Sequence, residues 1–153
     1  MAIQSCNLSC VGCTNYSDLI HKGYVSWKSI ENDLKEWLEV IDIEDFGIMG
    51  GEPLLNPEIE QWIIGIRKLL PNSRIRFTTN GLKLHKNFHL VDLMHKLGNF
   101  SFKITVHKNT KELQKTIDKI LNSYDWKPVA EFGIDRLITT NDFRFHVKSP
   151  STF

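Results

Sequence analysis

The sequence has no long apolar run and no excess of charge of either sign. No stretch reaches the roughly 18 uncharged apolar residues that a membrane span needs, and the first six residues lack the basic flank and apolar core of a signal peptide. Nineteen Lys and Arg against eighteen Asp and Glu leave a formal charge of +1, which gives no strong field for nucleic acid. We therefore expect a cytoplasmic protein that binds neither a membrane nor nucleic acid.

Cysteine is also scarce, with only Cys6, Cys10 and Cys13 in the chain. An odd number crowded into eight residues is not a disulfide framework, which uses even numbers spread along a secreted chain. The 41% of hydrophobic residues can nevertheless form a real core, and 153 residues fit one domain of the usual length of about 100–200. We expect a single domain over 1–153. Because no convincing sixth structural unit follows, three interpretations stay open: a gene product truncated on its C-terminal side, a fragment, or a small protein with an open side.

Helical and strand-like apolar patterns alternate along the chain. Residues spaced three and four apart predict helices over 27–41, 59–70, 90–97 and 113–124. Short apolar or alternating runs predict strands over 46–49, 74–78, 100–106, 129–134 and 143–148. Strands that alternate with helices imply right-handed βαβ units and a parallel sheet. A closed eight-unit barrel needs about 250 residues, so the predicted fold class is α/β, a partial (open) β/α barrel of roughly five βα units.

Capping and turn residues support these boundaries. Ser26 is placed to cap the first helix, Asn56 with Pro57 to open the second, and Asn109 with Glu112 to form a capping box before the last. The Asn80-Gly81 pair could close a hairpin, but the residues after it do not alternate, which favours a turn from strand to helix. Gly98 is a plausible stop for the helix that follows.

The three cysteines form the pattern Cys6-x-x-x-Cys10-x-x-Cys13 on one short segment. Clustered thiolates select zinc or iron–sulfur chemistry. A structural zinc site takes four protein ligands, and the only nearby candidate for the fourth is His21. A [4Fe–4S] cube held by three cysteines would instead keep one iron open to a small molecule.

The segment Cys6-Asn7-Leu8-Ser9-Cys10-Val11-Gly12-Cys13 resembles the cluster loop of radical S-adenosylmethionine (radical SAM) enzymes. Two further segments are similar to motifs of that family. Gly50-Gly51-Glu52-Pro53-Leu54-Leu55 resembles its GGEP motif, and Thr78-Thr79-Asn80-Gly81 resembles its TNG turn. Each follows a predicted strand, and the resemblance extends from Cys6 to about residue 110.

The resemblance implies an enzyme with two cofactors, a [4Fe–4S] cluster and S-adenosyl-L-methionine. Cys6, Cys10 and Cys13 would bind the cluster. One electron would cleave S-adenosylmethionine to methionine and a 5′-deoxyadenosyl radical, which abstracts hydrogen from the substrate. Two enzymatic or structural alternatives stay open: an activase of glycyl-radical enzymes, whose cluster loop has the same spacing, and a non-catalytic zinc or iron–sulfur binding module.

The resemblance also implies where the S-adenosylmethionine would bind. Without side chains, Gly50 and Gly51 would let the backbone approach its methionine ammonium, while Pro53 holds Glu52 extended. A tight turn at the glycines, and a favourable charge near a helix start for Glu52, are the alternatives.

Three polar residues after the later strands complete the expected cofactor site, namely Thr79, Asn80 and Thr105. Asn80 could equally stabilise its own turn. Strand alternation would place His107 on the face of Thr105, although solvation at a strand end explains His107 as well. No catalytic residue is assigned.

The chain departs from the family at two points. Gly12 stands where an aromatic residue usually precedes the third cysteine, so shielding would come from elsewhere, for example Tyr16, and the adenine motif of the fifth strand is absent from 132–135. With three cysteines committed, an auxiliary cluster would need thiolates from a partner. The expected partners are a small-molecule or peptide substrate, an electron donor such as flavodoxin or ferredoxin, and a protein that closes the open barrel.

Overall fold

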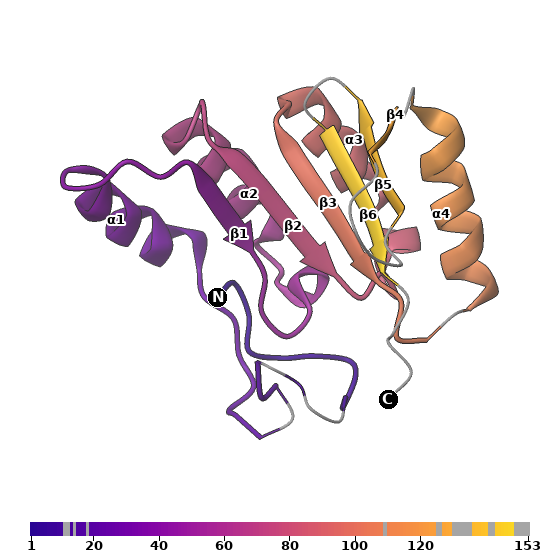
Figure 1. The fold of residues 1–153 in the computed structure, drawn as a ribbon. Coiled ribbons are helices and arrows are strands. Elements are labelled where there is room, and N and C mark those ends of the chain that lie inside the picture. Colours follow the sequence, from indigo (N-terminus) through magenta and orange to yellow (C-terminus); the bar gives the residue numbers. More distant parts are fainter. Residues whose placement is uncertain are drawn as a thin grey trace. The chain divides into compact units, whose positions relative to one another are not determined.

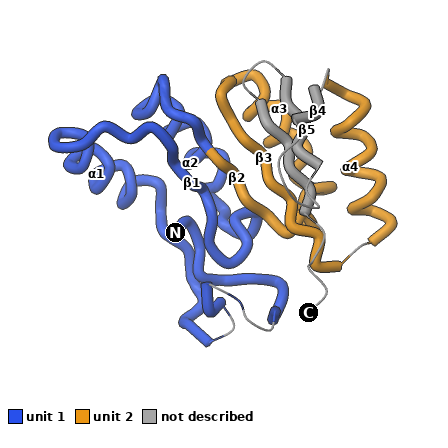
Figure 2. Tube along the Cα trace, viewed as in Figure 1, with its two compact units in different colours: residues 1–75 blue, residues 76–153 orange. Residues whose placement is uncertain are grey.

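The computed structural model describes residues 1–10, 13, 15–17, 19–108 and 110–124, and the backbone of three later strands within 127–148. The chain forms two compact units, residues 1–75 and residues 76–153 (Figure 2). No helix in the described ranges is long and apolar enough to cross a bilayer.

The first unit contains two packed helices beside a strand (Figure 1). Its elements are α1 (Trp27–Leu38), β1 (Asp45–Ile48), the short 3₁₀ helix η1 (Pro53–Leu55) and α2 (Ile59–Leu69). The Ser26 hydroxyl accepts a hydrogen bond from the Ser29 N–H at 3.3 Å, so the predicted cap of α1 is confirmed. Helix α2 begins after the Asn56-Pro57 pair, as expected.

Close contact between α1 and α2 depends on Gly65. A Cβ atom there would lie 2.0 Å from the ring of Trp27, which itself packs edge-on against Trp62 with ring centroids 6.2 Å apart. The start of the next strand pairs with the start of β1, because the Arg74 N–H donates to the Glu44 carbonyl at 2.8 Å. These contacts form the framework of the first unit, which contains the three cysteines and Gly50–Pro53.

The second unit is a sheet with helices between its strands. Its elements are β2 (Arg74–Thr79), which straddles the unit boundary, η2 (Leu84–Lys86), α3 (Phe88–Leu97), β3 (Phe100–Thr105), α4 (Lys111–Ser123), β4 (Lys127–Val129), β5 (Arg136–Thr140) and β6 (Phe143–Lys148). The strand order is β2-β3-β6-β5-β4, and β4 has a single neighbour. Strands β2 and β3 run in one direction (Figure 1), and β6 pairs parallel to β3 with Phe102 opposite Phe145.

The predicted α/β class with an open parallel sheet is confirmed, although the last three strands differ in detail from the prediction. Strand β5 was not predicted and pairs antiparallel with both β4 and β6. Strand β4 ends at Val129, where the expected strand over 129–134 begins, and residues 130–135 lie outside the described part. In the described chain, helices therefore follow only β1, β2 and β3. A five-residue strand gains its stability from its neighbours, so a sequence pattern that short does not reveal it.

The core of the second unit comes from alternate residues of β2 and β3. Phe77 and Phe102 are fully buried and stack with ring centroids 5.5 Å apart. Gly81 has φ +76°, which suits the predicted turn from strand to helix, and Gly98 ends α3 with φ +70°. The N-cap of α4 is Thr110, whose hydroxyl accepts from the Leu113 N–H at 3.1 Å, and the expected capping residue Asn109 lies outside the described residues.

Candidate functional site

The strand-like segment 1–5 leads directly into Cys6 and lies beside the turn that follows β1. Ile3 pairs in parallel with Gly50. The Gly51 N–H donates to the Ile3 carbonyl and the Glu52 N–H donates to the Ser5 carbonyl, both at 2.9 Å. The residue immediately before the first cysteine is therefore held by the segment that resembles the GGEP motif.

Gly50 and Gly51 make this close approach sterically feasible. A Cβ atom on Gly50 would lie 2.2 Å from the Ile3 carbonyl oxygen, and one on Gly51 would lie 2.2 Å from the Ser5 carbonyl oxygen. Real Cβ atoms essentially never come within 3.0 Å of such an atom. The two glycines therefore make room for the backbone of residues 3–5 of the same chain. A contact between the glycines and a methionine ammonium stays a prediction.

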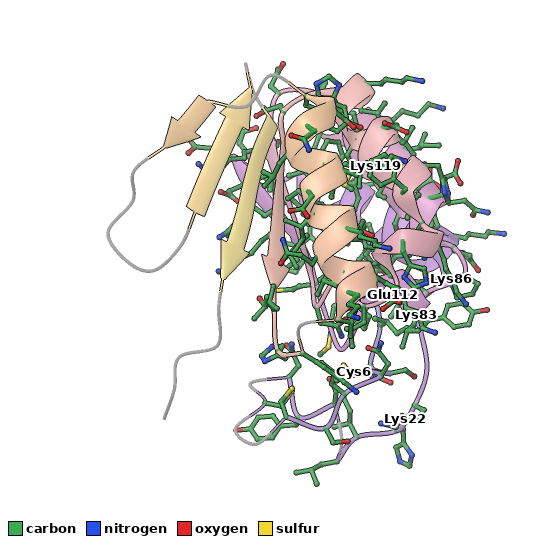
Figure 3. All side chains as sticks on the ribbon, turned by 90° about the vertical axis from the view of Figure 1, so that its right-hand side faces the viewer. Cys6, Lys22, Lys83, Lys86, Glu112 and Lys119 are labelled. Atoms are coloured by element: carbon green, nitrogen blue, oxygen red, sulfur yellow. The ribbon has the colours of Figure 1, made fainter. Side chains whose placement is uncertain are left out.

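The segment after the cysteines returns to the same place and closes a loop. Gln4 and Ser5 donate their N–H groups to the Gly23 carbonyl at 3.0 and 3.3 Å, and the Gly23 N–H donates to the Ser5 hydroxyl oxygen at 3.0 Å. We call residues 6–22, which lie between these paired ends, the cysteine loop. Cys6 and Lys22 mark its two ends in Figure 3, and the Lys22 ammonium donates to the Ser17 carbonyl at 2.6 Å.

Asn15, a residue of the cysteine loop, connects this loop to the turn after β1. Its side-chain N–H₂ donates to the Gly50 carbonyl at 2.6 Å. The cysteine loop and the Gly50–Pro53 segment are therefore brought together by the first unit, through both the entry strand and a side chain of the loop itself.

The three cysteines are half-buried, and none of them forms a disulfide. The Cys13 N–H donates to the Cys10 carbonyl at 3.2 Å, which holds the backbones of the last two cysteines together. No group of three His, Cys, Asp or Glu side chains within the described ranges lies close enough to hold a metal ion. The structure thus places Cys6, Cys10 and Cys13 on one closed loop without gathering them around a common point, and the same holds for a zinc set that includes His21.

Cys13 lies where a thiolate is stabilised. Its pKa is below the ordinary thiol value, chiefly because the backbone N–H of Ser17 donates toward its sulfur, with smaller contributions from Asn15, Tyr16 and the Ser17 hydroxyl and against a rise from partial burial. The Ser17 hydroxyl is 1% exposed, and it has no hydrogen bond of normal geometry within the described part of the chain. A buried hydroxyl of this kind is suited to donate to a sulfur or to a group held beside it.

Glu52 is fully buried and acts first as a capping residue. Its carboxylate accepts from the Leu54 N–H at 3.1 Å at the start of η1. Its backbone is extended, with φ −133° and ψ 106°, as expected before Pro53. The observed contact agrees with the alternative in which Glu52 serves a helix start, and a contact with the cofactor stays a prediction.

The other expected cofactor residues belong to the second unit. The Thr79 hydroxyl accepts from the Gly81 N–H, and the Asn80 carboxamide oxygen accepts from the Leu82 N–H, each at 3.0 Å. Both side chains are buried and stabilise their own turn, which lies against the end of β3 because a Cβ on Gly81 would lie 2.9 Å from Ile104.

Thr105 is the last residue of β3 and is half-buried. The predicted shared face with His107 does not follow, because the strand ends at Thr105 and regular alternation stops there. The His107 side chain is exposed, and its N–H donates to the Thr105 carbonyl at 3.1 Å. The observed environment of His107 is that of a solvated residue at a strand end.

The sequence analysis missed the residues that join the ends of the cysteine loop. Asn56 was expected only to open a helix, yet its buried carboxamide donates to the carbonyls of Ala2 and Val25. Ser5 and Gly23 had no assigned role. The available signal was an Asn-Pro pair close to the Gly-Gly-Glu-Pro run, but the residues that Asn56 contacts are 54 and 31 positions away in the chain.

A comparison with known families decides the affiliation of the chain. The family model described as the radical SAM superfamily matches residues 2–135, which include the cysteine loop, the Gly50–Pro53 segment and the Thr79–Gly81 turn. The chain belongs to the radical SAM superfamily. Its members use a [4Fe–4S] cluster and S-adenosylmethionine, and no curated protein gives a significant match to the chain.

Solved structures support the fold of this radical SAM chain. A crystal structure of BtrN in complex with AdoMet and 2-DOIA matches with a TM-score of 0.62 and 22% identity over 77% of the chain. BtrN in an open conformation matches with a TM-score of 0.52 and 22% identity over 71% of the chain. The chain spans about half of those proteins, since 48% of each BtrN chain is covered.

The residues present fit the cofactors of the superfamily in their chemistry. Three cysteines on one closed loop, none of them in a disulfide, form the donor set that a cluster with one open iron requires. The lowered pKa of Cys13 and the buried Ser17 hydroxyl beside it suit a thiolate ligand.

Proposed function

We propose that the protein is a radical SAM enzyme in which Cys6, Cys10 and Cys13 bind one [4Fe–4S] cluster. The enzyme cleaves S-adenosylmethionine reductively and uses the 5′-deoxyadenosyl radical to abstract hydrogen from a small-molecule or peptide substrate. One observation carries the proposal most directly: three cysteines that form no disulfide occupy a loop whose entry strand is bonded to the Gly50–Pro53 segment within the region matched by the superfamily.

When bound, the cluster supplies the electron that breaks the carbon–sulfur bond of S-adenosylmethionine. The chain contributes binding and orientation. The Gly51 and Glu52 N–H groups fix Ile3 and Ser5, so that Cys6 begins from a defined position. Asn15 holds the loop against the turn after β1 by donating a hydrogen bond to the Gly50 carbonyl.

The residues proposed to contact S-adenosylmethionine lie at or after the ends of strands, namely Gly50, Gly51, Glu52, Pro53, Thr79, Asn80 and Thr105. Two facts support this assignment. Each lies within or directly after a strand end or the turn that follows it, and AdoMet is bound in the BtrN complex, whose fold is similar. In sheets of this kind, ligands bind outside the carboxyl ends of parallel strands.

The proposed enzyme also needs partners. Its three cysteines suffice for one cluster only, so the electron would come from a separate donor such as flavodoxin or ferredoxin. Among the described strands β4 pairs with β5 alone, and we propose the other edge of β4 as the place where a partner protein closes the barrel.

Anaerobic reconstitution with iron and sulfide tests the proposal. We expect about four irons per chain, as the cube requires, and 5′-deoxyadenosine on addition of dithionite and S-adenosylmethionine. Cys10→Ala should abolish the product, whereas Ser9→Ala, which changes a neighbouring residue of the same loop, should retain it. Purified protein that holds zinc and yields no 5′-deoxyadenosine would contradict the proposal and support the zinc module.

A further inference from the structure

Asn56 connects both ends of the cysteine loop. Its side-chain N–H₂ donates one hydrogen to the Ala2 carbonyl at 2.9 Å and the other to the Val25 carbonyl at 3.2 Å. Its carbonyl oxygen accepts from the Glu58 N–H at 2.8 Å. Ala2 lies before the loop and Val25 after it. A single carboxamide therefore connects the segment that enters the loop with the segment that leaves it.

The hydrogen-bonding capacity of Asn56 is fully directed toward this arrangement. A neutral carboxamide has two donor hydrogens and one carbonyl oxygen, and here both donors and the oxygen have backbone partners. The side chain is 2% exposed, so water cannot replace bonds that are lost. No other natural side chain of this size offers two donors and an acceptor.

The position of Asn56 is itself fixed by the same structural unit. It follows η1, where its N–H donates to the Pro53 carbonyl at 2.9 Å, and it precedes α2. The loop ends are therefore tied to the element that also carries Gly50–Pro53. The direct bond between the ends, from the Val25 N–H to the Ala2 carbonyl at 3.2 Å, shares its acceptor with Asn56.

We propose that Asn56 is a positioning residue for the cluster, because it holds the two ends of the cysteine loop at the separation from which Cys6, Cys10 and Cys13 converge on one metal centre. The inference rests on the proposed function. It adds a residue outside the three motifs, and it predicts that loss of the two donated hydrogen bonds weakens cluster binding more than it weakens the fold.

The first test measures these hydrogen bonds directly, in the protein of residues 1–153 without a cluster. Asn56→Asp keeps the size and the acceptor oxygen of Asn56. It replaces the N–H₂ group, which carries both donor hydrogens, with a second oxygen. We expect hydrogen exchange at the amides of Gln4, Ser5 and Val25 to accelerate about tenfold or more, since two buried hydrogen bonds are lost. Unchanged exchange at these amides would overturn the proposal.

The second test measures cluster binding against two controls. Asn87→Asp makes the same substitution where a half-buried Asn of the second unit donates to the Lys83 carbonyl at 2.9 Å. Ile63→Val removes one methyl group from a fully buried residue of α2 and so weakens the core of the first unit. After anaerobic reconstitution, we expect Asn56→Asp to hold less than about half of the iron of either control, whose ligand set is complete.

The spectrum of the reduced cluster gives a readout that lower stability alone does not change. The electron paramagnetic resonance signal of the cluster fraction that Asn56→Asp retains should differ from that of Ile63→Val. Equal iron content and an identical signal, at any stability, would overturn the proposal. If Asn56→Asp does not fold, Ser5→Ala is tested instead, because it removes the hydrogen bond from the Gly23 N–H between the same two ends of the cysteine loop. Ser5→Ala should also lower the iron content. An unchanged iron content would overturn the proposal.

Failure of the proposed function gives a different pattern. If the wild-type chain takes up no iron while exchange at Gln4, Ser5 and Val25 still accelerates in Asn56→Asp, the tie exists and the cluster assignment is wrong. If the wild-type chain takes up iron and the variant matches it, the cluster assignment stands and the role of Asn56 is wrong.

Discussion

Replacement of Gly51 by alanine should damage the chain far more than the same change at Gly47, four residues earlier. The added Cβ at Gly51 would lie 2.2 Å from the Ser5 carbonyl oxygen and 2.8 Å from the Gln4 carbonyl oxygen. Both are backbone atoms, which cannot rotate away. The entry strand of the cysteine loop must therefore move by roughly 1 Å to restore ordinary contact distances.

The free-energy cost follows from the bonds that this shift breaks. The bonds from the Gly51 and Glu52 N–H groups are both 2.9 Å long, and a movement of this size ends them. Two net hydrogen bonds at about 1 kcal/mol each and overpacking of about 1–3 kcal/mol give about 3–5 kcal/mol in the free energy of unfolding. The total free energy of unfolding of a domain of this size is about 5–15 kcal/mol.

Gly47 provides the matched control within the same unit. A Cβ there would meet only the sulfur of Met49, at 4.0 Å, an ordinary contact. Because alanine has less backbone freedom to lose than glycine, Gly47→Ala should be neutral or stabilising by up to about 1 kcal/mol. Urea unfolding followed by circular dichroism measures both variants. A Gly51→Ala protein within about 0.5 kcal/mol of wild type would refute the steric argument.

Three further changes test other parts of the structure. Glu52→Gln retains an acceptor for the buried cap and should cost about 1 kcal/mol less in urea unfolding than Glu52→Ala, which leaves a buried N–H without a partner; equal losses would contradict the capping role. Gly81→Ala should cost about 1–3 kcal/mol more than Gly98→Ala, since both have positive φ but only at Gly81 would the Cβ meet neighbours within 3 Å; equal thermal shifts would contradict this. Burial, followed by the hydrogen bond to Asp92, raises the pKa of Tyr124, so the folded state keeps its proton longer and stability should fall as pH rises past about 10; Tyr124→Phe should flatten that fall in melts at several pH values, and an unchanged slope would refute the assignment.

The sequence predicts those elements whose signals are local. The helices around Ile63 and Ile120 have apolar residues three and four apart, and Ile59, Ile63, Ile117 and Ile120 among them are buried, whereas in α1 Leu34 is buried and Trp37 is exposed. Phe100, Phe102 and Ile104 alternate in β3 and are buried as well. In both cases the burial pattern depends on the period of the element itself, so the sequence contains the information.

Long-range pairing is less accessible to such reasoning. Strand β5 exists because β4 and β6 flank it, and the N-cap of α4 shifts by one residue, to Thr110, because its hydroxyl reaches the Leu113 N–H. The carboxamide of Asn56 contacts Ala2, 54 residues away. Patterns over a few residues do not encode partners at that separation, and the residues that close the cysteine loop were missed for this reason.

Gly50 and Gly51 show why a local pattern can indicate a close approach without identifying its partner. The absence of a Cβ is needed here for the chain's own entry strand, a role that exists whether or not a cofactor is bound. This structural role leaves room for the proposed one. The Gly50 carbonyl accepts from Asn15 and the Glu52 carbonyl from the Leu55 N–H, whereas no hydrogen bond among the described residues uses the Gly51 carbonyl. An ammonium group needs acceptors, so under the proposed function we expect the Gly51 carbonyl to be the group of this turn that contacts the methionine ammonium. The same glycine would then serve both partners, its N–H holding the strand that leads to Cys6 and its carbonyl holding the ligand.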